Sequence, residues 1–122
     1  MHYNDAATTV NDLKKLIERF VRDREWEKFH TPRNLAESIC IEAAELLEIF
    51  QWDLANESDS ILNDSVKFGR LKEELADVLI YCLSLANRTK IDIAEAIADK
   101  MEKNERKYPV EKFKGFYEKK ES

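Results

Sequence analysis

The sequence predicts an all-α protein, folded as an antiparallel bundle of helices, and two observations point to it. The 122 residues contain only two glycines and two prolines, so few positions supply the turns that an all-β fold requires. Apolar residues recur at intervals of three and four, which is the spacing that lines one face of a helix. With 43% hydrophobic residues the chain can bury a core, and its length suits one domain.

Four helices joined by short connections are predicted, at residues 10–29, 32–54, 66–88 and 93–107. The polar stretch 56–63 is predicted to be a loop. Pro109 ends the last helix, because proline cannot continue the hydrogen-bond ladder, and residues 110–122 are expected to form a tail.

Capping signals support these helix starts. Thr9 with Asp12 resembles a capping box before the first helix. Thr31 is suited to cap the second helix, and Pro32 suits its first position. Asp92 begins the fourth helix in the same way.

Charge and hydropathy exclude several classes of partner. The net charge is 20 − 25 = −5, so the backbone of a nucleic acid is not an expected partner. No stretch approaches the roughly 18 apolar residues of a membrane span, and the N-terminus lacks a signal-peptide pattern. Cys40 and Cys82 fall in apolar helical patterns and are expected to be buried thiols. Together these features predict a cytoplasmic protein.

Carboxylates occur within the apolar face of the second predicted helix. Glu42 falls near the middle of this face and Glu45 at its edge. A carboxylate at such a position is costly to desolvate unless it is paired or binds a metal, and a buried ion pair is the alternative interpretation. The apolar members of the face are Leu35, Ile39, Leu46, Ile49 and Phe50.

The third helix carries a second acidic pair, Glu74 and Asp77, and Tyr81 and Arg88 continue the same stripe. Each pair has the i, i+3 spacing that places two side chains on one side of a helix. In an antiparallel hairpin the four acids could face each other and would repel without cations, although two unrelated solvated pairs are the alternative. Oxygen ligands alone suit Mg²⁺ or Mn²⁺, and the Glu-x-x-His pairs of di-iron bundles are absent from the sequence.

The fourth helix and the aromatic residues suggest contacts for a phosphorylated ligand. Asn104 lies on the inner face of the fourth helix beside Lys100, where an amide and a cation suit phosphate oxygens; a satisfied core Asn is the alternative. Trp26, His30 and Trp52 flank the second helix and could stack a nucleobase, although the pattern alone favours packing at helix ends.

Five motifs occur in order and carry a resemblance to a known family. They are FH-x-PRNL, E-x-x-E, FQW, EEL-x-DVLIY and K-x-x-x-N-x-x-x-YP, and they lie between about Leu13 and Gly115. In this order they resemble the MazG-like nucleotide pyrophosphohydrolases, with the dCTP pyrophosphatase branch as the most similar. Ala44 stands where that branch has glycine, and Ile17 stands where some members have a histidine near the base.

The resemblance implies a helical bundle completed by homodimerisation, or by pairing of dimers into a tetramer. It implies that residues 9–109 form the catalytic domain, after an N-terminal extension of residues 1–8. It implies an Mg²⁺ site formed by Glu42, Glu45, Glu74 and Asp77. The positions that match substrate contacts are Trp26, His30, Trp52, Tyr81, Arg88, Lys100, Asn104 and Tyr108.

The predicted reaction is Mg²⁺-dependent hydrolysis of a nucleoside triphosphate, dCTP or a related dNTP, to the monophosphate and pyrophosphate. Glu45, with Glu42, would orient or deprotonate the attacking water, and Lys100 would stabilise the departing pyrophosphate. Two alternatives remain from the sequence alone: a dUTPase-type activity of the same superfamily, and a helical interaction module without catalysis.

Overall fold

The computed structural model describes residues 2–115, and within this range the regular structure consists of helices without any strand. The all-α prediction is therefore confirmed. The chain divides into two compact units, one reaching to Lys90 and the other beginning at Ile91. This boundary falls inside the predicted domain of residues 9–109.

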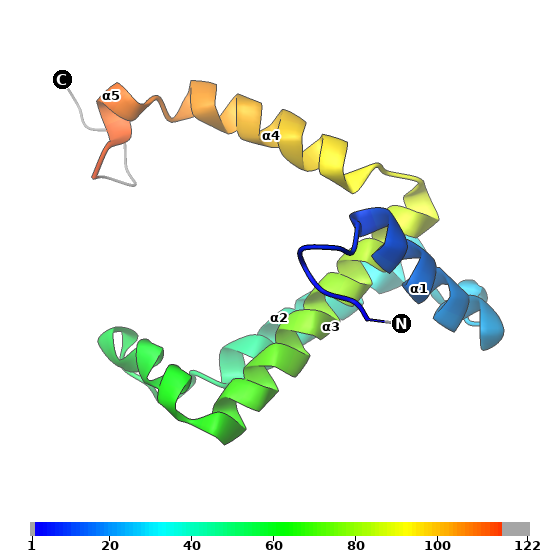
Figure 1. The fold of residues 1–122 in the computed structure, drawn as a ribbon, viewed down its shortest axis with the longest axis horizontal. Helices are drawn as coiled ribbons and strands as arrows, with labels where there is room; N and C mark the ends of the chain where they lie inside the picture. The colour runs from blue at the N-terminus through cyan, green and yellow to red at the C-terminus, as the bar shows by residue number, and fades with distance from the viewer. Residues whose placement is uncertain (1, 116–122) are drawn as a thin grey trace. The chain divides into compact units, whose positions relative to one another are not determined.

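The first unit is built around a helical hairpin. Helices α2 (Pro32–Glu48) and α3 (Ser65–Thr89) lie side by side and run antiparallel, because the chain reverses through the 3-10 segment η2 (Ala55–Asn63) (Figure 1). Helix α1 (Val10–Asp23) packs on α3, and the short 3-10 turn η1 (Glu27–Phe29) leads from α1 into α2. The bounds of α3 agree with the prediction to within one residue at each end.

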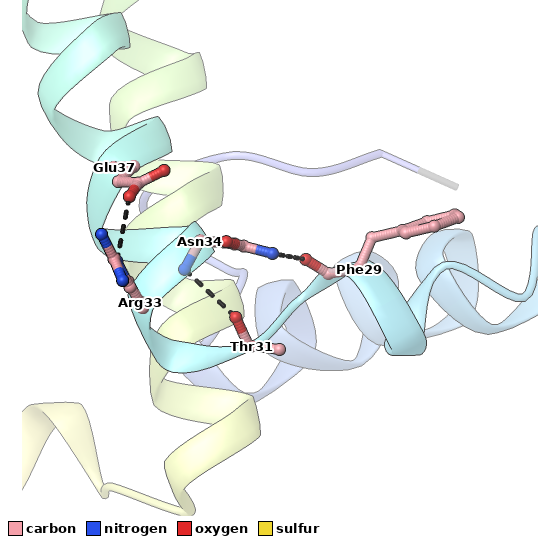
Figure 2. Close-up of polar contacts among 5 residues, drawn as sticks. All are labelled: Phe29, Thr31, Arg33, Asn34 and Glu37. Atoms are coloured by element: carbon pink, nitrogen blue, oxygen red, sulfur yellow. Dashed lines mark hydrogen bonds and ion pairs between the residues drawn. The ribbon is translucent and has the colours of Figure 1, made fainter.

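Both predicted caps of the first two helices are present. Thr9 and Asp12 form a reciprocal capping box, in which each side chain accepts the backbone N–H of the other at 3.0 Å. The side chain of Thr31 accepts the N–H of Asn34 at 3.2 Å (Figure 2). Pro32 occupies the first turn of α2. The first turns of α1 and α2 thus have partners for donors that a helix otherwise leaves free.

The first helix ends earlier than predicted, at Asp23 rather than residue 29. Glu25 has φ 53°, and the N–H groups of Glu25 and Trp26 donate to the carbonyls of Arg22 and Val21. This pair of bonds is a Schellman motif, which closes a helix with a left-handed residue. The turn brings the Trp26 ring edge-on to Phe20, with ring centroids 5.7 Å apart.

The second helix also ends early, at Glu48 rather than residue 54. The N–H groups of Phe50 and Gln51 donate to carbonyls three residues back, so the chain changes from α-helical bonds to tighter turns. Residues 56–63, predicted to be a loop, lie in the 3-10 segment η2, and its Ile61 is buried.

The core of the first unit is small. Several large apolar side chains of this unit are exposed, including Leu75 and Leu79 of α3 at 47% and 55%. Both cysteines are free thiols, but Cys40 is exposed rather than buried and Cys82 is half-buried. No helix within residues 2–115 is long and apolar enough to cross a membrane. The buried hydrophobic residues among those described are Leu35, Ile49, Ile61 and Ala86.

The second unit contains α4 (Ile93–Lys107), with the predicted bounds, and a short helix α5 (Val110–Phe113). Asp92 caps α4 by accepting the N–H of Glu95 at 3.0 Å, as expected. Residues 110–122 were predicted to be a tail; the first four form α5, and residues 116–122 lie outside the described range.

Candidate functional site

The acidic residues of α2 lie on the face by which this helix packs. Leu35, Glu42 and Ile49 are seven residues apart, which places them on one side of a helix. Leu35 and Ile49 are buried, at 1% and 5% exposure, and Glu42 between them is half-buried. A carboxylate therefore occupies the centre of an otherwise apolar seam, as the sequence predicted.

Three of the four predicted acids converge. One carboxylate oxygen from each of Glu42, Glu45 and Glu74 can be chosen so that all three lie within 4.8 Å of one another, and all three residues are half-buried. Two come from α2 and one from the facing turn of α3, because the antiparallel hairpin brings these turns together. This group is called the acid cluster below.

Burial and mutual repulsion change the titration of the acid cluster. Burial raises the pKa of Glu42 to about 7, and the neighbouring Glu45 carboxyl and the charge of Asp77 add to this rise. Burial also raises the pKa of Glu74, again with a contribution from Glu45. Within residues 2–115, Oε2 of Glu42 and Oε2 of Glu74 are buried without a hydrogen-bond partner. Unpaired buried carboxylate oxygens are suited to a cation.

Asp77 lies one turn beyond Glu74 on α3 and is not among the three closest carboxylates. Its charge nevertheless helps to raise the pKa values of Glu42 and Glu74. Asp77 also lines a large cavity between α1 and α3. The acid cluster and this cavity, called the α1–α3 cavity below, are therefore adjacent.

The α1–α3 cavity has a volume of about 760 Å³, within the range of small-molecule sites. It brings together Trp26, His30 and Tyr81, three of the predicted substrate contacts, with the rings of His30 and Tyr81 6.5 Å apart. Apolar side chains make up most of its wall, from Leu13, Leu16, Ile17, Phe20, Val21, Ala76, Leu79, Ile80 and Leu83.

Hydrogen bonds to the backbone hold the segment that carries Trp26 and His30. Arg88 of α3 donates from Nη1 to the carbonyl of Glu27 at 3.2 Å. Asn34 of α2 donates from Nδ2 to the carbonyl of Phe29 at 3.0 Å (Figure 2). Arg88 was predicted to contact substrate; in the structure its guanidinium binds this backbone.

His30 is suited to act as a neutral hydrogen-bonding group. Partial burial lowers its pKa, and the nearby positive charge of Arg88 lowers it further. A neutral imidazole can both donate and accept a hydrogen bond.

The remaining predicted contacts lie elsewhere. Trp52 is 88% exposed and lines a separate pocket of about 330 Å³ with Lys67 and Arg70. Lys100, Asn104 and Tyr108 belong to α4 and its end in the second unit, so their part in the site stays a prediction from the sequence.

Sequence reasoning missed two polar residues of α3 near the cavity. Ser84 lines it, and Asn87 donates from Nδ2 to the carbonyl of Lys14 in α1 at 3.0 Å. A signal existed for Ser84, since Asp77, Tyr81 and Ser84 follow the i, i+4, i+7 spacing of one helix face.

Comparisons with known proteins identify the family. The model of the MazG-like family matches residues 37–121. dCTP pyrophosphatase 1 of Bos taurus is 39% identical over 110 residues, which cover 90% of this chain and 65% of that protein. The Homo sapiens protein of the same name is 41% identical over 102 residues, covering 84% of this chain and 60% of that protein. The chain thus spans less than two thirds of the length of these curated relatives.

A solved structure has the same fold. The crystal structure of a pyrophosphatase from Archaeoglobus fulgidus DSM 4304 superposes with a TM-score of 0.78 at 46% identity, covering 89% of this chain and 98% of that one. From the matched family model, the extent of these similarities and the acid cluster on its helical hairpin, we conclude that the chain belongs to the MazG-like family.

Proposed function

We propose that this protein is a nucleoside triphosphate pyrophosphohydrolase, which cleaves its substrate to a nucleoside monophosphate and pyrophosphate. The observation that carries the proposal is the acid cluster, with unpaired buried oxygens on Glu42 and Glu74, beside a cavity large enough for a nucleoside. The names of the relatives, dCTP pyrophosphatase 1 and pyrophosphatase, point to the same reaction.

The acid cluster fits a hard divalent cation. Glu42, Glu45 and Glu74 offer converging oxygens, and Asp77 on the next turn would complete the set. Oxygen ligands without histidine or cysteine suit Mg²⁺ first and Mn²⁺ second. When bound, the cation would neutralise phosphate charge and lower the pKa of a coordinated water.

Side chains of the protein would position the attacking water and bind the departing pyrophosphate. Glu45 interacts electrostatically with both other acids of the cluster, since it helps to raise the pKa values of Glu42 and Glu74. It would orient or deprotonate the water that attacks the α-phosphorus. Lys100 and Asn104 would bind the departing pyrophosphate and stabilise the charge that develops on it. Tyr108 would contact the sugar or the phosphates.

The α1–α3 cavity would hold the nucleobase. Trp26 offers a face for stacking, and Tyr81 and His30 offer polar groups at the wall. dCTP or a related dNTP is the substrate that the relatives suggest. Trp52 lines a different pocket of the same unit, so its contact with the nucleobase rests on the sequence alone.

Exposed apolar side chains of α3 that do not line the α1–α3 cavity support self-association. Val66, Phe68 and Leu75 are 75%, 39% and 47% exposed. A second copy of the chain could cover them, as expected for a homodimer or for a tetramer of two dimers.

Pyrophosphate release tests the proposal. The purified protein is incubated with each standard NTP and dNTP, with Mg²⁺ and with EDTA. Glu45→Gln and Asp77→Asn are expected to lower kcat by at least about 100-fold while the helical circular dichroism signal is retained. Release that persists in both variants would remove the acids from catalysis. Absence of release from the wild-type protein with every nucleotide would favour the non-catalytic interaction module, and preference for dUTP would favour the dUTPase-type alternative.

A further inference from the structure

A buried hydroxyl group without a partner lies in the wall of the α1–α3 cavity. Ser84 of α3 is 5% exposed, and within residues 2–115 its Oγ has no hydrogen-bond partner. Ser84 also lines a second, smaller cavity of about 380 Å³, which shares Ile17, Val21 and His30 with the first. It therefore lies where the two cavities adjoin.

This arrangement is unfavourable for the free protein. A buried hydroxyl without a partner loses the hydrogen bonds that it would make with water. A serine in a helix often avoids this loss by donating to the carbonyl four residues earlier. On the same helix Thr89 does so, with 2.7 Å between Oγ1 and the carbonyl oxygen of Leu85. Ser84 does not.

Two other buried side-chain oxygens of the described residues also lack a hydrogen-bond partner. They are Oε2 of Glu42 and Oε2 of Glu74, which belong to the acid cluster. Asp77 connects that cluster to the cavity that Ser84 lines. Two of the three unpaired oxygens thus lie in the acid cluster and the third in a residue of the cavity wall, and Asp77 relates the two places because it lines the cavity and acts electrostatically on the cluster.

We propose that Ser84 is a specificity-determining residue, whose hydroxyl group forms a hydrogen bond with the polar edge of the nucleobase in the α1–α3 cavity. This inference rests on the proposed function. A ring with a polar edge suits Ser84, because the wall of the α1–α3 cavity is mostly apolar and Ile17 and Val21 line both cavities together with the serine. The phosphates belong at the other end of the site, near the acids.

The competing explanation is that Ser84 is small only to let α1 approach α3. Ala86, at 2% exposure, and the bond from Asn87 to Lys14 show that these helices pack closely in this region. On that explanation the hydroxyl has no role, and its removal leaves the choice of base unchanged.

Ser84→Ala separates the two explanations. We measure kcat and KM for pyrophosphate release from dCTP, dTTP, dUTP, dATP and dGTP, with the wild type, Ser84→Ala and the control Ser65→Ala. Ser65 is an exposed residue in the first turn of α3. In Ser84→Ala the ratio of kcat/KM between the best and the worst base is expected to fall about tenfold, through a higher KM for the best base, as for loss of one hydrogen bond. Ser65→Ala keeps the wild-type ratio.

Stability supplies a second readout. Because the hydroxyl has no partner in the nucleotide-free protein, Ser84→Ala is expected to unfold at the same or a higher urea concentration than the wild type. An unchanged ratio of kcat/KM in Ser84→Ala, or a wild type without any base preference, overturns the role of Ser84 and leaves the proposed function standing. A wild type that releases pyrophosphate from no nucleotide overturns the proposed function itself. If Ser84→Ala does not fold, Ser84→Cys, which has a similar size and a weak hydrogen-bonding group, decides by the same ratio.

Discussion

Replacing Glu42 by glutamine should stabilise the metal-free protein at pH 8 and have little effect at pH 5. Burial and the neighbouring acids raise the pKa of Glu42 from its ordinary 4.5 to about 7. The folded state therefore holds this proton more tightly than the unfolded state. This tighter proton binding stabilises the folded state. The stabilisation is fully present below the unfolded-state pKa and is lost as the pH rises through about 7. Glutamine has no proton to lose in this pH range, so its contribution to stability does not change between pH 5 and pH 8.

The size of the effect follows from the same values. At 1.36 kcal/mol per pKa unit, a rise from 4.5 to about 7 corresponds to ~3 kcal/mol. The acid cluster is partly open to water, which screens its charges, so we expect ~1 to 2 kcal/mol in the free energy of unfolding. Glu42→Gln should exceed the wild type by this amount at pH 8.

Urea denaturation in EDTA at pH 5 and pH 8 measures the difference. His30 acts in the opposite direction, because burial lowers its pKa and the folded protein loses stability as the pH falls below the unfolded-state value of 6.5. Comparing the two proteins at each pH cancels this contribution, which both share. Adding Mg²⁺ at pH 8 should reverse the order, since a bound cation stabilises only a folded state that retains its ligands. If wild type and variant differ equally at both pH values, the electrostatic account of the acid cluster is wrong.

Two further predictions concern hydrogen bonds described above. Arg88→Ala should raise KM for the preferred nucleotide by roughly tenfold with little change in kcat, because Arg88 holds the Glu27 carbonyl and hence the segment beside the cavity. Steady-state kinetics test this, and a loss confined to kcat would contradict it. Thr31→Ala should lower the free energy of unfolding by ~1 kcal/mol in urea denaturation, since it removes the side chain that caps α2 by accepting the N–H of Asn34. Thr31→Ser should retain this energy, and equal losses in both variants would show that the cap contributes nothing.

Helix starts could be predicted from the sequence because their signals are local and chemical. Thr9, Thr31 and Asp92 each supply a side-chain acceptor at the predicted position, and all three caps are present. The acids of α2 and α3 were recognised for a related reason: their spacing places them on packed faces, and two helices joined by a short connection pack as a hairpin.

The helix ends were missed because their causes are not visible in residue type. The first helix stops at a left-handed Glu25, a position that usually requires glycine or asparagine. The second stops after Glu48, where the sequence contains neither glycine nor proline. In both cases the chain leaves the helix through local backbone bonds between residues whose types do not announce a stop.

The sequence could not predict which of the expected substrate contacts share one cavity. Helical spacing placed Tyr81 beside Asp77, and both line the cavity. It carried no information on the direction in which the chain leaves α2, and this direction places Trp52 in a pocket of its own. Sequence periodicity describes one element at a time, whereas a cavity depends on several.

The hairpin makes the acid cluster sensitive to one kind of movement. Its three oxygens span 4.8 Å, while sliding α2 along α3 by a single helical turn would displace them by about 5.4 Å. Leu35 and Ile49 are buried on either side of Glu42, and such a slide would also displace these two side chains from their buried positions. The axial register of α2 against α3 therefore determines whether the three carboxylates lie close enough together to share a cation.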